Sequence, residues 1–339
     1  MSKVVFAKAP LRLGLAGGGT DLEPYRKEYG GVVLSGTIDQ YAYCKVEPWD
    51  DWCFKSVDLD LEETHTFYES IDCSTSLKLL ITPYKHLMDG CGQRTPIKIT
   101  TYVEAPPGSG LGSSSALVVA VVSALCEYHN LPKDEYEIAN LAVHVERNLC
   151  ELPGGLQDQY SASFGGFNYI EFLESGRTIV NPLRLNYKIQ NMLELNTVLY
   201  YVGTPRKDAH VIDATSENLR NNKSTLEATH KIKDACVEFK QSLLVGDVKK
   251  ISDLMNEYWT HKLKTSSKVA NAKMLDVYDF AMKNGATAAK ISGAGGGGHM
   301  IFFTDFERRH KLLTALKEIP DGRVVPFKFV KHGVDVWRQ

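Results

Sequence analysis

The stretch "EAPPGSGLGSSSALVVAVVSAL", from Glu104 to Leu125, constrains this chain more than any other. Gly108, Gly110 and Gly112 precede a serine run and a long apolar segment that predicts a helix over 114–128. A helix begins with unpaired N–H groups and partial positive charge, and glycines lack the Cβ atoms that would keep an anion away from the backbone. The stretch therefore predicts a phosphate-binding loop, with a flexible loop capped by serine as the alternative.

A second glycine cluster, "KISGAGGGGHMIFF", matches G-x-G-x-x-G at Gly293, Gly295 and Gly298. A dinucleotide-binding fingerprint must open a helix, whereas the apolar residues after this cluster predict a strand. The loop at 108–112 matches neither this pattern nor a Walker loop, which requires a lysine that is missing there. We therefore expect the second cluster to be tight backbone packed against a ligand phosphate or against the other half of the chain. A bulged hairpin is the alternative.

A third cluster, "PLRLGLAGGGTD", places Arg12 before three consecutive glycines that are followed by Thr20 and Asp21. Three glycines in a row cost conformational entropy on folding, which favours a place where a polar ligand approaches the backbone closely. Asp21 would then accept hydrogen bonds from ligand hydroxyls. It could also cap a helix in the following segment, "LEPYRKEYG".

Two carboxylates in "HVERNLCELPGGLQDQYSASFGG" suit phosphate chemistry. Glu146 lies on a predicted helix over 134–149, and magnesium needs only one or two protein carboxylates besides phosphates and water. A serine hydroxyl of the glycine loop would complete the protein ligands. Asp158 could accept a proton from an attacking hydroxyl, with Arg12 stabilising the ionised carboxylate. Alternatively, Glu146 lies on a solvated helix face and Asp158 caps the next helix.

Composition narrows the class of protein. The chain has 339 residues, of which 43% are hydrophobic and 24% charged, and its formal net charge is −2. These values are ordinary for a soluble globular enzyme and predict no nucleic-acid partner. No apolar run is long enough to span a bilayer and no signal peptide is evident, so we expect no membrane partner. Seven cysteines without a C-x-x-C pair indicate free thiols in a reducing cytosol, and a cytoplasmic location is expected.

The order of predicted elements indicates two mixed halves. Strands and helices alternate up to the segment "GGFNYIEFL", and a strand, "TVLYYVG", then precedes mainly helical sequence over 208–284. Strand, glycine loop, strand and a final helix near 308–316 follow. We therefore expect an α+β protein with domains at 1–185 and 186–339, and a cleft between such halves favours a ligand site.

The three glycine segments together resemble the signature segments of the GHMP small-molecule kinase superfamily. The resemblance spans nearly the whole chain. It implies a ribosomal-protein-S5-like N-terminal domain and a ferredoxin-like C-terminal domain. The "GGGTD" form and "LPGGLQDQYSASFGGFNYIEF" resemble the sugar-1-kinase branch. This implies ATP-dependent phosphorylation of the C1 hydroxyl of D-glycero-D-manno-heptose 7-phosphate for bacterial surface-glycan synthesis. A kinase of fucose or galactose, or an inactive nucleotide- or sugar-binding regulator, is the alternative.

The resemblance also implies roles for particular residues. The phosphate-binding loop would comprise Pro107, Gly108, Ser109, Gly110, Leu111, Gly112, Ser113, Ser114 and Ser115. Asp158 would be the catalytic base with Arg12 as its partner, and Mg²⁺ would lie at Ser114 and Glu146. The sugar pocket would include Gly18, Gly19, Thr20, Asp21, Gly155, Gly293 and Gly295. Arg206 and Lys207 would bind the 7-phosphate or be exposed loop charges. ATP, Mg²⁺ and a small sugar phosphate are thus the expected ligands, and a homodimer is compatible.

Overall fold

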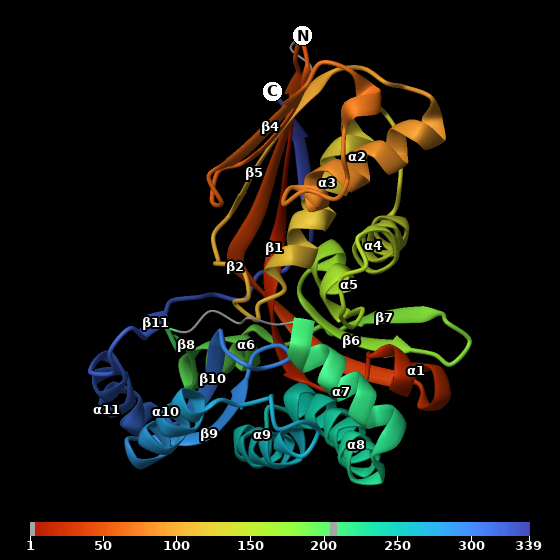
Figure 1. Cartoon of the computed structure of the whole chain (residues 1–339). Coiled ribbons are helices and arrows are strands. Elements are labelled where there is room, and N and C mark those ends of the chain that lie inside the picture. The colour runs from red at the N-terminus through yellow and green to blue at the C-terminus, as the bar shows by residue number, and fades with distance from the viewer. Residues whose placement is uncertain (1–3, 204–208) are drawn as a thin grey trace.

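Two β-sheets with their helices organise the chain in the computed structural model, which describes residues 4–203 and 209–339 (Figure 1). The larger sheet has the strand order β12-β1-β2-β5-β3-β4, with β6 pairing with β2 and β7 with β6. Its strands are β1 (Val5–Ala16), β2 (Gly31–Pro48), β3 (Trp52–Ser56), β4 (Leu61–His65), β5 (Ile97–Val103), β6 (Phe167–Phe172), β7 (Thr178–Pro182) and β12 (Asp335–Arg338).

Helices of the N-terminal half gather beside this sheet (Figure 1). They are α1 (Glu23–Tyr29), η1 (Tyr68–Ser70), α2 (Lys78–Cys91), α3 (Ser113–Tyr128), α4 (Glu135–Val143), η2 (His144–Leu149) and α5 (Gln157–Phe164). The central one is α3, which contacts both β1 and β2 as well as α2, α4 and α5. A helix enclosed on all sides must be apolar around its whole circumference, which explains the run "ALVVAVVSAL".

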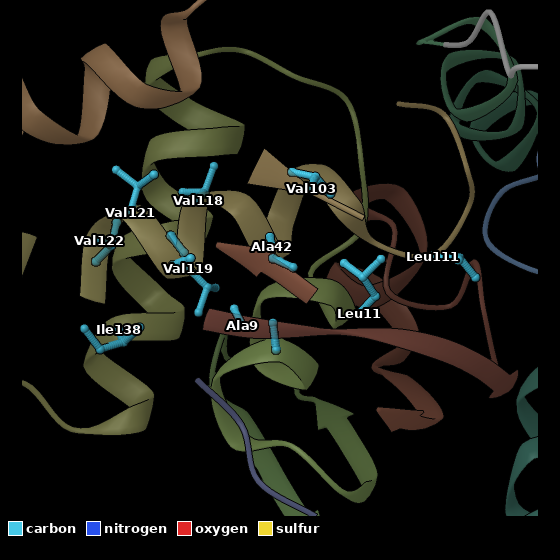
Figure 2. Close-up of a cluster of buried hydrophobic side chains, with 14 of the residues drawn as sticks. Ala9, Leu11, Ala42, Val103, Leu111, Val118, Val119, Val121, Val122 and Ile138 are labelled. Atoms are coloured by element: carbon cyan, nitrogen blue, oxygen red, sulfur yellow. The ribbon is translucent and has the colours of Figure 1, made fainter. Parts of the chain in front are cut away.

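Figure 2 shows this core, where Val118, Val119 and Val122 of α3 lie near the strands. Ala9 of β1 and Ala42 of β2 are register partners, and both are fully buried. Small side chains on the two central strands let the helix approach closely, and its branched valines fill the space. This packing fixes the position of the first turn of α3, which the functional site uses.

The second sheet has the order β11-β8-β10-β9. Its chain runs through α6 (Tyr187–Asn196), β8 (Thr197–Tyr201), α7 (Ala209–Asn221), α8 (Lys223–Val245), α9 (Val248–Leu263), α10 (Ala272–Lys283), β9 (Ala286–Ile291), β10 (His299–Thr304), α11 (Phe306–Lys317) and β11 (Arg323–Val325). This is a strand–helices–strand–strand–helix–strand order, so the ferredoxin-like arrangement is confirmed. The helix α8 contacts both α9 and β2, and thereby joins the two halves.

Several local predictions agree with the structure and two differ. The glycine loop at 293–298 joins two antiparallel strands, as expected. The sequence "GVVLSGTIDQYAYCKVEP", residues 31–48, predicts two β-rich runs around Asp39, whereas the structure forms one long strand, β2. The predicted helix over 134–149 begins as α4 and changes at His144 to the π-helix η2, in which Val145 and Glu146 are buried. All seven cysteines are free thiols.

The domain division at 185/186 stays a prediction. The last strand, β12, pairs with β1, so the chain's C-terminal residues lie in the large sheet and both ends meet there (Figure 1). Over residues 4–203 and 209–339, the structure contains no helix with the length and hydropathy needed to cross a membrane.

Candidate active site

Residues from all three glycine segments line one cavity of about 380 Å³. The first segment contributes Arg12, Gly18, Gly19 and Asp21, the second Gly108, Gly110, Gly112 and Ser113 to Ser115, and the third Gly293. Glu146, Gly155 and Asp158 lie in the same wall. The fold therefore brings together residues that are far apart in sequence, and most of the predicted site residues are among them.

The glycine loop before α3 requires glycine for its backbone conformation. Gly108, Gly110 and Gly112 have φ angles of 72°, 76° and 77°, in the left-handed region that residues with a Cβ avoid. A Cβ at Gly110 would also overlap the backbone carbonyl of Ser292 in the third glycine segment. The loop thus ends at the N-terminus of α3 with its N–H groups close to the cavity, which suits an anion.

The third glycine segment supports this loop from behind. His299 donates its backbone N–H to the Ser109 carbonyl at 3.1 Å, and its ring Nδ1 lies 2.7 Å from the same oxygen. Because a carbonyl only accepts hydrogen bonds, Nδ1 carries the proton. Burial lowers the pKa of His299 to about 4, so the ring is neutral. Ser292 donates its hydroxyl to the Gly110 carbonyl at 2.9 Å, which adds a second brace.

Glu146 is a buried carboxylate of the cavity wall, with 2% of its surface exposed. The hydroxyls of Ser114 and Ser115 donate to its two oxygens at 2.7 Å each, and Gln159 Nε2 donates at 2.5 Å. The π-helix η2 carries this residue, and such wide turns are common at functional sites. The alternative of a solvated helix face is therefore wrong for Glu146.

Arg12 and Asp158 form a close ion pair across 146 residues of sequence. Nε and Nη2 of Arg12 both lie 2.7 Å from Asp158 Oδ1, and Nη1 donates to the Gly110 carbonyl at 2.6 Å. Asp158 lies in the first turn of α5, but Leu156 is the N-cap, so the capping alternative is wrong. The arginine is 4% exposed and holds the carboxylate beside the phosphate loop.

Asp21 also lines the cavity and is 1% exposed. Its carboxylate accepts hydrogen bonds from the Gly19 N–H at 3.2 Å and from the backbone and side-chain nitrogens of Gln157 at 3.2 and 3.1 Å. Its second alternative, capping α1, is wrong because Leu22 occupies the N-cap position. A Cβ at Gly155 would overlap this carboxylate, which explains the glycine.

Some predicted residues lie behind the cavity wall instead of in it. Thr20 is fully buried, and its hydroxyl donates to the Val32 carbonyl at 2.7 Å. Gly295 packs on the Val269 carbonyl. Pro107, Ser109 and Leu111 belong to the loop, although the described cavity wall does not include them. Arg206 and Lys207 lie outside the described residues.

Several residues in or behind the cavity wall were not predicted from sequence. Gln157 lines the cavity and Gln159 is buried outside its lining, and both could have been found as polar neighbours of the base, Asp158. Lys262 reaches the cavity from α9 and donates to the Gly18 carbonyl at 3.2 Å. No local sequence pattern predicts this contact. Arg147 donates Nε to the Gly155 carbonyl at 3.0 Å and lines the cavity.

Lys290 is the least expected of the missed residues. It ends inside the protein, where its Nζ donates to the carbonyls of Gly14 at 2.5 Å and Ile291 at 2.9 Å. Burial, and then the charges of Arg12 and Lys262, lower its pKa to about 7. The area around the phosphate loop is thus rich in basic groups, as an anionic ligand requires.

Comparison with known proteins identifies the fold family. The family model of the GHMP kinases N terminal domain matches residues 78–166, and that of the GHMP kinases C terminal domain matches 238–321. A D-glycero-alpha-D-manno-heptose 7-phosphate kinase from Campylobacter jejuni is 39% identical, over 99% of each chain. The chain belongs to the GHMP kinase family.

Other GHMP kinases resemble this one over its whole length. The crystal structure of a D-glycero-D-manno-heptose 1-phosphate kinase from Bacteroides thetaiotaomicron superposes with a TM-score of 0.85 at 36% identity, covering 99% of both chains. An L-fucokinase/L-fucose-1-P guanylyltransferase from Bacteroides fragilis is 25% identical over 99% of this chain and 39% of its own length. The expectations of a GHMP kinase and of a two-domain α+β fold are thereby confirmed.

Proposed function

We propose that this GHMP kinase transfers the γ-phosphoryl group of ATP to the C1 hydroxyl of D-glycero-D-manno-heptose 7-phosphate and forms the 1,7-bisphosphate. The similarity to the Campylobacter jejuni kinase supports the substrate. The Arg12–Asp158 pair, which lies between the phosphate loop and Asp21 in one cavity, supports the reaction.

Asp158 would take the proton of the attacking hydroxyl. Its carboxylate lies against the phosphate loop, since a Cβ at Gly112 would lie 3.4 Å from Oδ2. Arg12 ties this base to the loop because it binds both Asp158 and the Gly110 carbonyl. The carboxylate is thus held in one position, as general base catalysis needs.

The residues present fit ATP and Mg²⁺. The N-terminus of α3 and Lys262 offer donors and positive charge to phosphates. Ser114 and Glu146 provide hard oxygen atoms, and one carboxylate with phosphates and water is a usual magnesium environment. When bound, Mg²⁺ supplies charge neutralisation on the transferred phosphoryl group. Asp21 and the neighbouring backbone would hold the sugar hydroxyls.

The setting we propose is the bacterial cytoplasm, in a heptose pathway that feeds a surface glycan. A kinase of another sugar, such as fucose or galactose, is the second candidate, which the similarity to the Bacteroides fragilis fucokinase favours. An inactive regulator is disfavoured because it would have no need of the buried Arg12–Asp158 pair.

Steady-state release of ADP with a panel of sugars tests the proposal. The expected result is a kcat/KM for D-glycero-D-manno-heptose 7-phosphate that exceeds those for fucose and galactose by at least about a hundredfold, since a site built for polar groups rejects substrates that lack them. A higher value for fucose or galactose would contradict the assignment and favour the second candidate.

A further inference from the structure

A second cavity of about 610 Å³ adjoins the candidate active site. The two share part of their walls, formed by Leu22, Arg147, Leu152, Pro153, Gly154 and Ile212. Beyond this shared wall, the second cavity is lined by α1, by the start of β7 and by α7, which lies beside α1 (Figure 1). The proposed reaction as described above assigns no ligand group to this second cavity.

Three arginines line this second cavity: Arg26 of α1, Arg147 of η2 and Arg220 of α7. Nε of Arg26 is buried and has no hydrogen-bond partner within the described ranges. A buried donor without a partner costs free energy of folding, so a ligand atom that accepts this hydrogen bond would recover that free energy on binding. The chain brings Arg26 here only five residues after Asp21, the residue expected to hold the sugar.

Arg220 adds a second positive charge to the cavity, and no described residue pairs with it. It ends α7 and forms no hydrogen bond or ion pair in the part of the chain that the structure describes. After Lys27, which pairs with Glu23, the charges of Arg26 and Arg220 also help to lower the pKa of Glu23. Both guanidinium groups therefore act on the same small region.

Arg147 connects the two cavities. Its Nε donates to the Gly155 carbonyl and its Nη1 to the Leu152 carbonyl at 3.2 Å, which fixes the guanidinium in the shared wall. A Cβ at Gly154 would overlap this group, so glycine makes room for it. Nη1 of Arg147 also lies 3.4 Å from Glu146 Oε1, while Arg12 binds Asp158 and Lys262 binds the Gly18 carbonyl.

Carboxylates of Glu23, Glu151 and Asp213 also line the second cavity. Glu23 is already paired with Lys27 at 2.5 Å, and all three residues are exposed. Arg220 is also exposed, but Arg26 contributes a buried donor that has no partner among the described residues. Guanidinium groups bind phosphate monoesters through two parallel hydrogen bonds, whereas exposed carboxylates stay hydrated at the rim.

From this arrangement we infer that the second cavity binds the phosphate that the sugar substrate already carries, through Arg26, Arg147 and Arg220. The inference rests on the proposed function and names the subsite for the end of the sugar opposite to C1. The sugar would then extend from Asp158 past Asp21 into the second cavity, and the enzyme would select phosphorylated sugars over free ones.

Binding measured without ATP tests the inference independently of turnover. Isothermal titration with D-glycero-D-manno-heptose 7-phosphate and with the unphosphorylated heptose gives two dissociation constants, and their ratio reports the contribution of the phosphate. The variants are Arg26→Gln and Arg220→Gln. Arg184→Gln is the matched control because Arg184 is exposed and lines neither cavity.

We expect the wild type to prefer the phosphorylated sugar, and each cavity variant to reduce the ratio by about tenfold, the effect of one charge-assisted hydrogen bond. The control should leave the ratio unchanged. A ratio near one in the wild type, or a ratio that both cavity variants leave intact, would overturn the subsite. The two cavity variants could reduce the ratio of dissociation constants as expected while the wild type phosphorylates no C1 hydroxyl. This result would support the subsite and refute the proposed function.

Discussion

Replacing Asp158 separates chemistry from binding in this kinase. A positioned general base contributes about 10² to 10⁴ in rate, which corresponds to roughly 3–5 kcal/mol of barrier. We therefore expect Asp158→Asn to lower kcat by at least about a hundredfold, and Asp158→Ala to abolish measurable turnover. The dissociation constant of ATP should change little, because α3 and its loop, which are expected to bind the phosphates, remain intact.

The same substitutions should also lower the free energy of unfolding, because they remove the partner of the buried Arg12 side chain. Arg12 is 4% exposed and would keep only the Gly110 carbonyl as a strong partner after Asp158→Ala. Breaking a buried ion pair costs about 3–5 kcal/mol of unfolding free energy. In Asp158→Asn the amide oxygen still accepts from Arg12, and the cost should be nearer 2 kcal/mol.

Three measurements on each variant test this reasoning: ADP release, ATP binding by isothermal titration, and urea unfolding. Asp134→Ala is the control, because Asp134 forms a capping box with Glu137 far from the cavity. It should lose about 1 kcal/mol of stability with unchanged activity. Turnover of Asp158→Asn within tenfold of the wild type would refute the role of the base, and so would loss of ATP binding together with turnover.

Three further predictions follow from the site. Glu146→Gln should raise the Mg²⁺ concentration for half-maximal activity at least about tenfold in a metal titration, since the carboxylate is the expected ligand; an unchanged midpoint would contradict this. Gly155→Ala should displace Asp21 and raise KM for the sugar about tenfold, with KM for ATP nearly constant; equal changes in both constants would argue against a sugar site. Lys290, whose pKa falls from 10.5 to about 7, is charged in both states below pH 7 but takes up a proton on unfolding between pH 7 and 10.5. As the pH rises through that window, the free energy of unfolding of the wild type should therefore increase relative to that of Lys290→Met by about 1.4 kcal/mol per pH unit, as measured by urea unfolding. A difference between the two proteins that does not change with pH would contradict the burial argument.

The glycine segments could be predicted from sequence because their constraint is local. Gly108, Gly110 and Gly112 adopt positive φ angles, and such positions are recognisable in any chain. The pairing of Arg12 with Asp158 is different, because it spans 146 residues and depends on the fold. The residue types that phosphoryl transfer needs, and then the family resemblance, suggested the pair as a hypothesis, but sequence spacing alone does not bring the two side chains together.

Isolated side chains that reach the site from ordinary helices and strands could not be predicted from the sequence. Lys262 lies on an amphipathic helix outside the quoted segments. Lys290 is the first residue of "KISGAGGGGHMIFF", but it lies in a buried strand and only the glycines of that segment were interpreted. The π-helix at Glu146 was also missed, because η2 has only six residues and its one buried apolar residue, Val145, also fits the α-helical pattern. Arg26 of the second cavity follows the same rule, because only tertiary structure leaves its Nε buried without a partner.

Phosphorus NMR of the reaction with ATP, Mg²⁺ and D-glycero-D-manno-heptose 7-phosphate tests the central claim most directly. The account predicts a new anomeric phosphate signal that grows together with ADP while the 7-phosphate signal persists, which identifies the 1,7-bisphosphate. Parallel reactions with fucose and galactose should give no such signal. An anomeric phosphate on fucose or galactose, with none on the heptose, would contradict the assignment of this kinase.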